Sequence, residues 1–382
     1  MAKITQKLSW QMANMKKVLM VTIAFILCLS AFLVPTPHAK AENLPGSSEK
    51  GILIKQWSYG LAPRYWWGYF GSSPAIANLG PDVNTIGGEP NSDLEIVVGS
   101  DGYWFYSPEL GYSVPGLWRA FDSQGNWEWA RSTQSDESRS SPVIIDLDGD
   151  GNLEIAGGTT SGWHFQVMNR KGEFIWMFPK FTAYVGGPFI WPSSPAAADI
   201  NPKVSGIELV IGNRYHGSIW AFKGIPNGIN DGITITTADF PYFPYSLGTE
   251  GVDWDVLWVV KTGGEVWATP AIGDVDNDGT LEVIIGSTDR KLYIINGADG
   301  SVEATIPVGS SIYASAALAN LDADPYLEIV ISSTDGKVYC YQWNGVSDKT
   351  EWTFSTGAAI YSSASIGDID GDGNLEIVVG ST

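Results

Sequence analysis

The sequence predicts an all-β protein, and three observations predict it. Glycine (44 residues) and aromatic residues (12%) are both abundant in the 382-residue chain, a composition typical of sheet proteins with many tight turns. Short apolar runs of strand length alternate with turns rich in Gly and Asp. The same succession of runs and turns recurs six times, which indicates one repeated unit of supersecondary structure.

Each repeat begins with a segment of small residues that reads Ser-Ser-Pro-Ala or a variant of it. An acidic turn follows, and then an apolar run that begins with Glu. These glutamates are 46 to 74 residues apart, at Glu95, Glu154, Glu208, Glu282, Glu328 and Glu376. A third, aromatic run and a fourth run that often carries Trp complete the unit in every repeat except the last.

Four short strands in about 45–50 residues is the period of a β-propeller blade. The predicted fold is therefore a propeller of about six four-stranded blades over residues 42–382. The first strand of each blade would line the central channel, where small residues and an edge proline fit. The second strand would be covered on both faces by neighbouring blades, which explains its unbroken apolar character. We disfavour a solenoid, because strands linked by hairpins do not resemble one coil of a β-helix.

The sequence leaves two explanations for how the ring of blades closes. The sixth repeat stops at Thr382, directly after its second strand. Residues 50–59 (KGILIKQWSY) resemble a fourth strand and would complete the last blade, but a third strand would still be missing. Either the last blade is short or the chain is a fragment of a longer protein, and we favour the second explanation.

Residues 1–41 predict a secretory signal peptide. Four lysines and no acid precede the uncharged apolar run 18–34, and Ala39-Lys40-Ala41 offers a cleavage site after Ala41. The alternative is an uncleaved membrane anchor, since 17 apolar residues reach the lower limit of a spanning helix. Cleavage would give a secreted or cell-surface protein with a single cysteine, Cys340, which we expect to be a packed strand residue.

The charge of the chain excludes several classes of function. Lys and Arg number 22 against 42 Asp and Glu, so the formal net charge is −20. This excess of acid argues against a nucleic-acid partner, whose phosphates are bound by Lys and Arg. Two cysteines and three histidines are too few for a disulfide framework or a zinc site. The composition suits a secreted or cation-loaded protein.

Three of the acidic turns predict metal sites. Each has Asp at positions 1, 3 and 5 and Gly at position 6, where a positive φ lets the backbone double back. We expect the three carboxylates, the position-7 carbonyl and Glu at position 9 to surround one Ca²⁺ per turn, about three ions in all; Mg²⁺ fits less well because it demands a compact octahedron. The predicted ligands are Asp146, Asp148, Asp150, Asn152 and Glu154; Asp274, Asp276, Asp278, Thr280 and Glu282; and Asp368, Asp370, Asp372, Asn374 and Glu376.

The turns are not EF-hands, and three further turns have lost the pattern. Position 12 is Gly157, Ile285 or Val379, none of which supplies the bidentate carboxylate of an EF-hand. The turns at 78–93, 199–202 and 320–325 lack the full set of Asp and Gly, yet their repeats keep the Glu. We infer that Glu also hydrogen-bonds the backbone at the start of the second strand, and its place among the metal ligands stays open.

These turns resemble the calcium-binding loops of FG-GAP/VCBS repeats, the propeller repeats also found in the heads of integrin α-subunits. The resemblance covers residues 50–382 and is most specific at 146–154, 274–282 and 368–376. It implies Ca²⁺ ligands at positions 1, 3, 5, 7 and 9, although Glu stands here where the family more commonly has Asp. Residues 120–129 (AFDSQGNWEW) are also similar to quinoprotein-like propeller repeats. The family includes adhesion, scaffolding and polysaccharide-degrading proteins, so the resemblance assigns no activity.

Aromatic residues gather just before the first strands of the repeats. On a propeller this junction lies at the channel mouth opposite the acidic turns, where rings either bind a sugar or protein partner or fill the channel. The loop 224–253 is a second candidate for specificity. The aromatic residues are Tyr65, Trp66, Trp67, Tyr69, Phe70, Phe189, Trp191, Trp267, Tyr313 and Tyr361.

The function predicted from the sequence is a non-catalytic binding or adhesion scaffold for a protein or carbohydrate ligand. A polysaccharide lyase or hydrolase is the alternative, but no spacing marks an acid/base pair, and His164 and His216 stand in no catalytic motif. A quinone-dependent dehydrogenase is less favoured, because the adjacent cysteine pair of many such enzymes is missing.

Overall fold

The computed structural model describes residues 72–80, 94–100, 116–133, 138, 140–159, 164–178, 192–214, 217–225, 233 and 256–382. Regular structure in these ranges consists of 22 β-strands, and none of the described residues forms a helix suited to crossing a membrane. The predicted signal peptide, residues 50–59 and most of the loop 224–253 lie outside the described residues.

The strands form five four-stranded antiparallel sheets and one two-stranded sheet, each with its strands in chain order, and we number these sheets as blades one to six. Blade one has β1 (Ala75–Ala77), β2 (Glu95–Ser100), β3 (Leu117–Phe121) and β4 (Trp127–Ser132). Blade two has β5 (Val143–Ile145), β6 (Glu154–Gly158), β7 (Phe165–Asn169) and β8 (Phe174–Phe178). Blade three has β9 (Ala196–Ala198), β10 (Glu208–Asn213), β11 (Ser218–Lys223) and β12 (Val256–Lys261). Blade four has β13 (Ala271–Gly273), β14 (Glu282–Gly286), β15 (Lys291–Asn296) and β16 (Val302–Pro307). Blade five has β17 (Ala317–Ala319), β18 (Glu328–Ser332), β19 (Lys337–Trp343) and β20 (Asp348–Ser355), and blade six has β21 (Ser365–Gly367) and β22 (Glu376–Val378).

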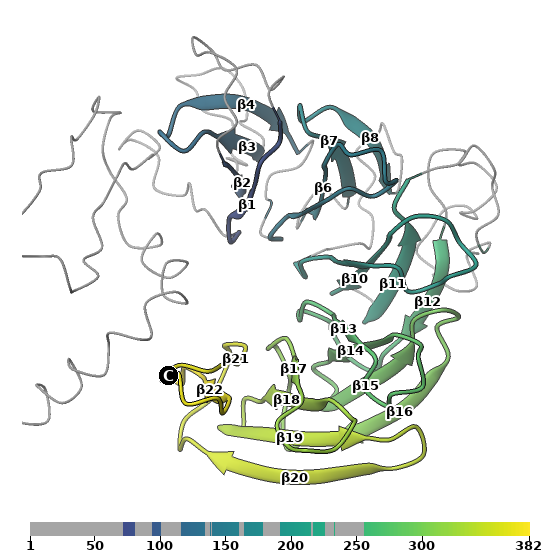
Figure 1. Ribbon diagram of the computed structural model, residues 1–382, viewed down its shortest axis with the longest axis vertical. Coiled ribbons are helices and arrows are strands. Elements are labelled where there is room, and N and C mark those ends of the chain that lie inside the picture. Colours follow the sequence, from purple (N-terminus) through teal and green to yellow (C-terminus); the bar gives the residue numbers. More distant parts are fainter. Residues whose placement is uncertain are drawn as a thin grey trace, which may run out of the picture.

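The sheets follow one another around a common centre, with the first strand of each innermost and the fourth outermost (Figure 1). Neighbouring first strands are in contact in the order β1, β5, β9, β13, β17 and β21. This arrangement is a β-propeller of about six blades, the last of which shows two strands among the described residues. The predicted fold class is confirmed.

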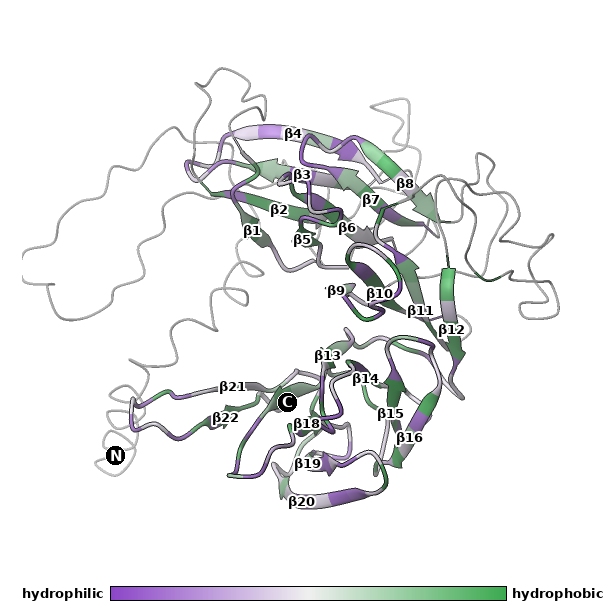
Figure 2. Cartoon of the chain, turned by 45° about the vertical axis from the view of Figure 1, so that its right-hand side comes forward, coloured by the Kyte–Doolittle hydropathy of each residue, from purple (hydrophilic) through white to green (hydrophobic). Residues whose placement is uncertain are grey.

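The hydrophobic core is divided among the interfaces between successive blades. Five clusters of buried apolar residues each join two neighbouring blades. On β10, Leu209 and Ile211 pack toward blade two, whereas Val210 between them packs toward blade four. Figure 2 shows that apolar residues lie mainly on strands and hydrophilic ones mainly in turns. The second strand is therefore apolar throughout because each of its faces belongs to a different interface, and each buried Leu, Ile or Val contributes about 1.5–3 kcal/mol.

Hydroxyl groups at the start of the first strands link the blades around the channel. The backbone N–H of Ser73 donates to Ser141 Oγ of the next blade (2.9 Å), and that of Ser141 donates to Ser194 Oγ (2.8 Å). The same bond joins Thr269 to Ser315 (2.9 Å), and Ser315 to the next blade. The recurrent Ser and Thr of the first segment thus satisfy backbone groups of the preceding blade, in addition to being small.

Tryptophans of the fourth strands make a second link between blades. The indole N–H of Trp176 on β8 donates to the carbonyl of Gly224 in blade three (2.7 Å). The indole of Trp258 on β12 donates to the carbonyl of Gly297 in blade four (2.7 Å). Cys340 on β19 is fully buried, and burial raises the pKa of its thiol to about 12, so its predicted role as a packed strand residue is confirmed.

Candidate metal centres

The three Asp-rich turns (146–154, 274–282 and 368–376) connect the first and second strands of blades two, four and six. Glycine at position 6 has the predicted positive φ, at Gly151 (87°), Gly279 (90°) and Gly373 (91°). Position 4 also has a positive φ, which the sequence analysis did not predict, at Gly149 (78°), Asn277 (58°) and Gly371 (76°). Asparagine tolerates this conformation better than most residues, so the three turns share one backbone path in spite of the substitution.

The aspartate at position 1 organises each turn. In blade two, Asp146 Oδ1 accepts hydrogen bonds from the N–H groups of Gly149 (2.8 Å) and Asp150 (3.1 Å). Its Oδ2 accepts from Gly151 (2.9 Å). Asp274 and Asp368 accept the corresponding bonds from positions 5 and 6 of their own turns. Backbone N–H groups of the loop thus hold it around the position-1 carboxylate.

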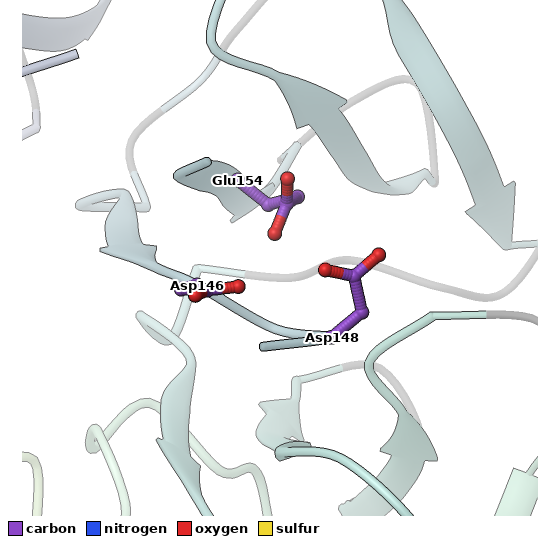
Figure 3. A group of neighbouring side chains, drawn as sticks. All are labelled: Asp146, Asp148 and Glu154. Atoms are coloured by element: carbon purple, nitrogen blue, oxygen red, sulfur yellow. The ribbon is translucent and has the colours of Figure 1, made fainter. Parts of the chain in front are cut away.

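Carboxylates at positions 1, 3 and 9 point toward one another in every Asp-rich turn. In blade two, Asp146 and Asp148 come from the loop and Glu154 comes from the first residue of β6, and the three face a common space (Figure 3). One oxygen from each lies within 4.8 Å of the other two, and the same holds for the matching residues in blades four and six, Asp274, Asp276 and Glu282, and Asp368, Asp370 and Glu376. Each group is thus able to hold a metal ion, with Glu at position 9 among the oxygens.

The residues at positions 5 and 7 are hydrogen-bonded to each other. Asp150 Oδ1 accepts from the backbone N–H of Asn152 (2.7 Å), and this bond lowers the pKa of Asp150. The hydroxyl of Thr280 donates to Asp278 (2.6 Å) and lowers the pKa of that carboxyl. The aspartates at position 5 are not in the groups of three found among the described residues. Metal ligation by Asp150, Asp278 and Asp372, and by the carbonyls of Asn152, Thr280 and Asn374, stays a prediction.

The glutamate that begins the second strand, which is position 9 of the Asp-rich turns, makes one hydrogen bond that is common to all six blades. Its Oε2 accepts from the backbone N–H of position 2, as in Glu154 with Leu147 (2.9 Å) and Glu282 with Val275 (2.9 Å). The other four pairs are Glu95 with Leu79, Glu208 with Ile200, Glu328 with Leu321, and Glu376 with Ile369. The structural role inferred for Glu is confirmed.

Burial sets the protonation of these glutamates when no cation is present. It raises the pKa of Glu154 and of Glu282 to about 7, against the opposing effect of the backbone N–H that each accepts. Neighbouring aspartates add to the shift, with Asp148 the largest such contribution at Glu154 and Asp276 at Glu282. A divalent cation in the group would favour the ionised carboxylates, so ion binding and proton release are coupled here.

The structure reveals a further acidic group in blade five. Oxygens of Asp322, Asp324 and Glu328 lie within 4.8 Å of one another, although the turn has Pro325 where the other turns have Gly. The amide of Gln342 on β19 donates to Asp324 and supplies a partner for that carboxylate. This turn was not among the predicted metal sites because it has Pro at position 6; its Asp-x-Asp pair and Glu, at positions 3, 5 and 9, are the signal that would have found it.

Three of the predicted aromatic residues fall in the described part of the chain. Trp267, Tyr313 and Tyr361 precede β13, β17 and β21, at the ends of these strands away from the acidic turns. Ring contacts join them, with centroids 6.0 Å apart for Trp267 and Tyr313 and 5.6 Å apart for Tyr313 and Tyr361. The remaining seven lie outside the described residues.

The fold and the acidic turns together define a β-propeller in which turns between first and second strands group carboxylates that could hold a metal ion. Residues 320–379, from the turn of blade five to β22, match the family model of the FG-GAP-like repeat. The FG-GAP resemblance expected from the sequence is confirmed over these residues, which carry an FG-GAP-like repeat. A search of curated protein sequences found no match.

Solved structures are similar to the chain at low sequence identity. Sqt1 of Saccharomyces cerevisiae is 9% identical with a TM-score of 0.49, over 75% of this chain and 66% of that one. Rhamnogalacturonan lyase PL11 of Bacillus licheniformis is 15% identical with a TM-score of 0.48, over 81% and 55%. The WD40 beta propeller domain of Doa1 is 14% identical with a TM-score of 0.40, over 75% and 71%. The chain thus spans less than two thirds of the length of the first two structures, and likeness of this degree carries no conclusion about activity.

Proposed function

We propose that the protein is a secreted or cell-surface, calcium-binding β-propeller that acts as a non-catalytic binding or adhesion scaffold for a protein or glycan. The observation that carries the proposal is the repetition of one carboxylate group in three blades, each with its oxygens within 4.8 Å. Three like charges so close together repel one another unless a cation lies between them. The predicted signal peptide supports an extracellular location, where weak calcium sites are filled.

The chemistry of the turns favours calcium over other cations. The side-chain donors are carboxylates, and hard oxygen ligands suit Ca²⁺ and Mg²⁺ rather than zinc or copper. The predicted ligand set of five positions suits the six to eight oxygens of Ca²⁺ better than the strict octahedron of Mg²⁺. Because each turn begins at an inner strand and ends at a buried second strand, a bound ion would hold the two strands in register.

Calcium titration tests the metal part of the proposal. Calorimetry on the metal-free protein should give about three ions per chain, and the melting temperature should rise with calcium because only the folded state presents the grouped carboxylates. One site held at a hundredfold excess over its Kd adds about 2.7 kcal/mol to the free energy of unfolding. A chelated sample that melts at the same temperature as the calcium-loaded one and takes up no calcium would refute the metal sites.

A polysaccharide lyase is a second candidate, favoured by one observation. A depression of about 420 Å³ beside the blade-two turn is lined by Asp148 and Glu154 and by the basic residues Arg170 and Lys171. Elimination next to a sugar carboxylate requires a cation to neutralise that carboxylate and a base to remove the adjacent proton. An assay for unsaturated products and new reducing ends on acidic and neutral polysaccharides separates the two functions, since product release would contradict the scaffold.

A further inference from the structure

Planar side chains from four successive blades form a continuous row on the face opposite the acidic turns. Arg214, directly after β10, stacks its guanidinium over Trp267 at 4.6 Å from the ring centroid. Tyr313 and Tyr361 continue the row at the steps of 6.0 and 5.6 Å given above. Each ring lies two residues before the Thr or Ser that starts its blade's inner segment, so the fold itself repeats the aromatic position around the channel mouth.

The row is held in place and is accessible. Glu265 accepts from the indole N–H of Trp267 through Oε2 (2.8 Å) and from Arg214 Nε through Oε1 (3.2 Å). One carboxylate thus fixes both planar groups and neutralises the guanidinium. Tyr361 is 56% exposed, and Trp267 and Tyr313 are half-buried. Among the described residues, the phenol hydroxyls of Tyr313 and Tyr361 make no hydrogen bond, so they are available to a ligand.

The surroundings of the row are polar. None of the exposed large aliphatic residues in the described part of the chain belongs to the segments 263–269, 309–315 or 357–363, which carry the rings. Apart from the rings, the residues of these segments that are not buried are Gly, Ala, Ser, Thr and Glu. An apolar peptide helix or strand would find only the ring faces and the small side chains of Ala358 and Ala359 to pack against. A ligand that combines apolar C–H faces with many hydroxyl groups fits both parts of this surface.

We infer that the row from Arg214 to Tyr361 binds a neutral polysaccharide along its length. Pyranose rings present C–H faces that pack on aromatic side chains, and the three rings, tilted by 54° and 48° to their neighbours, offer adjoining aromatic surfaces to such faces. The ligand is neutral because the charge of Arg214 is already paired with Glu265 and the chain as a whole carries −20, which repels acidic polymers. This inference rests on the proposed binding role and names its partner and its surface.

Calorimetric titration with defined hexasaccharides tests the inference. The probes are the β-1,4-linked hexamers of glucose, mannose and xylose, with polygalacturonate as the acidic comparison, all in saturating calcium. We expect the protein to bind at least one neutral hexamer and to prefer it to polygalacturonate. Trp267→Ala and Tyr361→Ala should each weaken that binding about tenfold or more, and Tyr361→Phe, which keeps the ring, should weaken it less.

Trp352→Ala is the matched control. This indole is 38% exposed on β20, the outermost strand of blade five, so its loss should leave glycan affinity unchanged. Four results would each overturn the inference: no neutral hexamer binds, polygalacturonate binds more tightly than the neutral hexamers, the row variants bind as tightly as the unsubstituted protein, or Trp352→Ala loses as much affinity as they do.

Calcium stoichiometry and melting temperature measured on the same samples show whether the variants are folded. A protein that binds glycan but takes up no calcium would overturn the metal proposal alone. Release of a cleaved glycan product would overturn only the proposal that the scaffold is non-catalytic.

Discussion

The turns of blades three and four share a glutamate but differ in everything around it. In blade three, Glu208 accepts the N–H of Ile200, and in blade four, Glu282 accepts the N–H of Val275, each at 2.9 Å. Blade four surrounds its glutamate with the Asp-rich turn, whereas blade three has Asn-Pro-Lys at the corresponding positions. The common bond shows that the glutamate belongs to the propeller fold. The aspartates are a separate feature, present as a full set in some blades only.

The blade-three turn is held by an amide instead of a carboxylate. Asn201 donates through Nδ2 to the carbonyl of Ala298 in blade four (3.0 Å), and its Oδ1 accepts the N–H of Lys203 (3.1 Å). This turn therefore has an amide, bonded within the turn and to blade four, where the Asp-rich turns have a group of carboxylates. The second oxygen of Glu208, however, is buried without a hydrogen-bond partner. We expect calcium to stabilise the blade-four turn and to leave the blade-three turn unaffected, and substitutions of Asp276, Asp199 and Glu208 test that contrast.

The largest effect is expected from Asp276→Ala in blade four. The substitution removes the position-3 ligand, so calcium stoichiometry should fall by one and the free energy of unfolding in saturating calcium should fall by about 3 kcal/mol. In EDTA the difference from the unsubstituted protein should disappear or change sign, because burial, and then the charge of Asp278, raise the pKa of Asp276 and make its charge unfavourable without a cation. Calorimetry and thermal melts in both conditions measure this.

Asp199→Ala is the matched control for that experiment. Asp199 occupies position 1 of the blade-three turn and is exposed, so its loss should change neither the stoichiometry nor the calcium-dependent part of the stability. An unchanged stoichiometry in Asp276→Ala, or an equal loss in Asp199→Ala, would contradict the assignment of ions to the Asp-rich turns.

A smaller effect, independent of calcium, is expected from Glu208→Ala. The backbone N–H of Asn201, 3.2 Å from Glu208 Oε2, would lose its acceptor, and that of Ile200, 2.9 Å from the same oxygen, would keep only the carbonyl of Ala198 at 3.1 Å. Leaving buried donors unpaired costs about 1–3 kcal/mol. Urea unfolding should show the same loss with calcium and with EDTA, and Glu208→Gln, which keeps an acceptor oxygen, should lose less. A loss seen only with calcium would mean that blade three also binds an ion.

Much of this contrast was predictable from the sequence, because it depends on local pattern. The repeated Glu, the positive φ of Gly279 and the start of each second strand follow from residue type and spacing within one turn. The features that were missed depend on other blades or on backbone context. The positive φ of Asn277 at position 4 has no glycine to mark it, and the carboxylate group of blade five was set aside because Pro325 replaces the expected Gly. The bond from Asn201 to blade four requires a tertiary neighbour that no local pattern identifies.

The smallest effect is expected from titration of Glu208, which lies in the turn without the aspartates. Burial raises its pKa to about 7 from an ordinary value of 4.5, against the bonds from Ile200 and Asn201. The folded state therefore holds this proton more tightly than the unfolded state does. The resulting stability is full below about pH 4.5, declines as the pH rises toward 7 and is gone above it.

In saturating calcium the position-9 glutamates of the Asp-rich turns should stay ionised across this pH range. Among the glutamates that begin the second strands, Glu208 should therefore contribute most to the change of stability with pH. The free energy of unfolding of the unsubstituted protein should fall by about 1 kcal/mol or more between about pH 5 and about pH 8 through this group. In Glu208→Gln, which has no proton to release, that part of the decline should be missing. Thermal melts across the pH range measure the difference between the two proteins. Parallel pH profiles would mean that Glu208 is ionised in the folded state, and that the buried oxygen without a partner carries a charge that the blade-three turn tolerates.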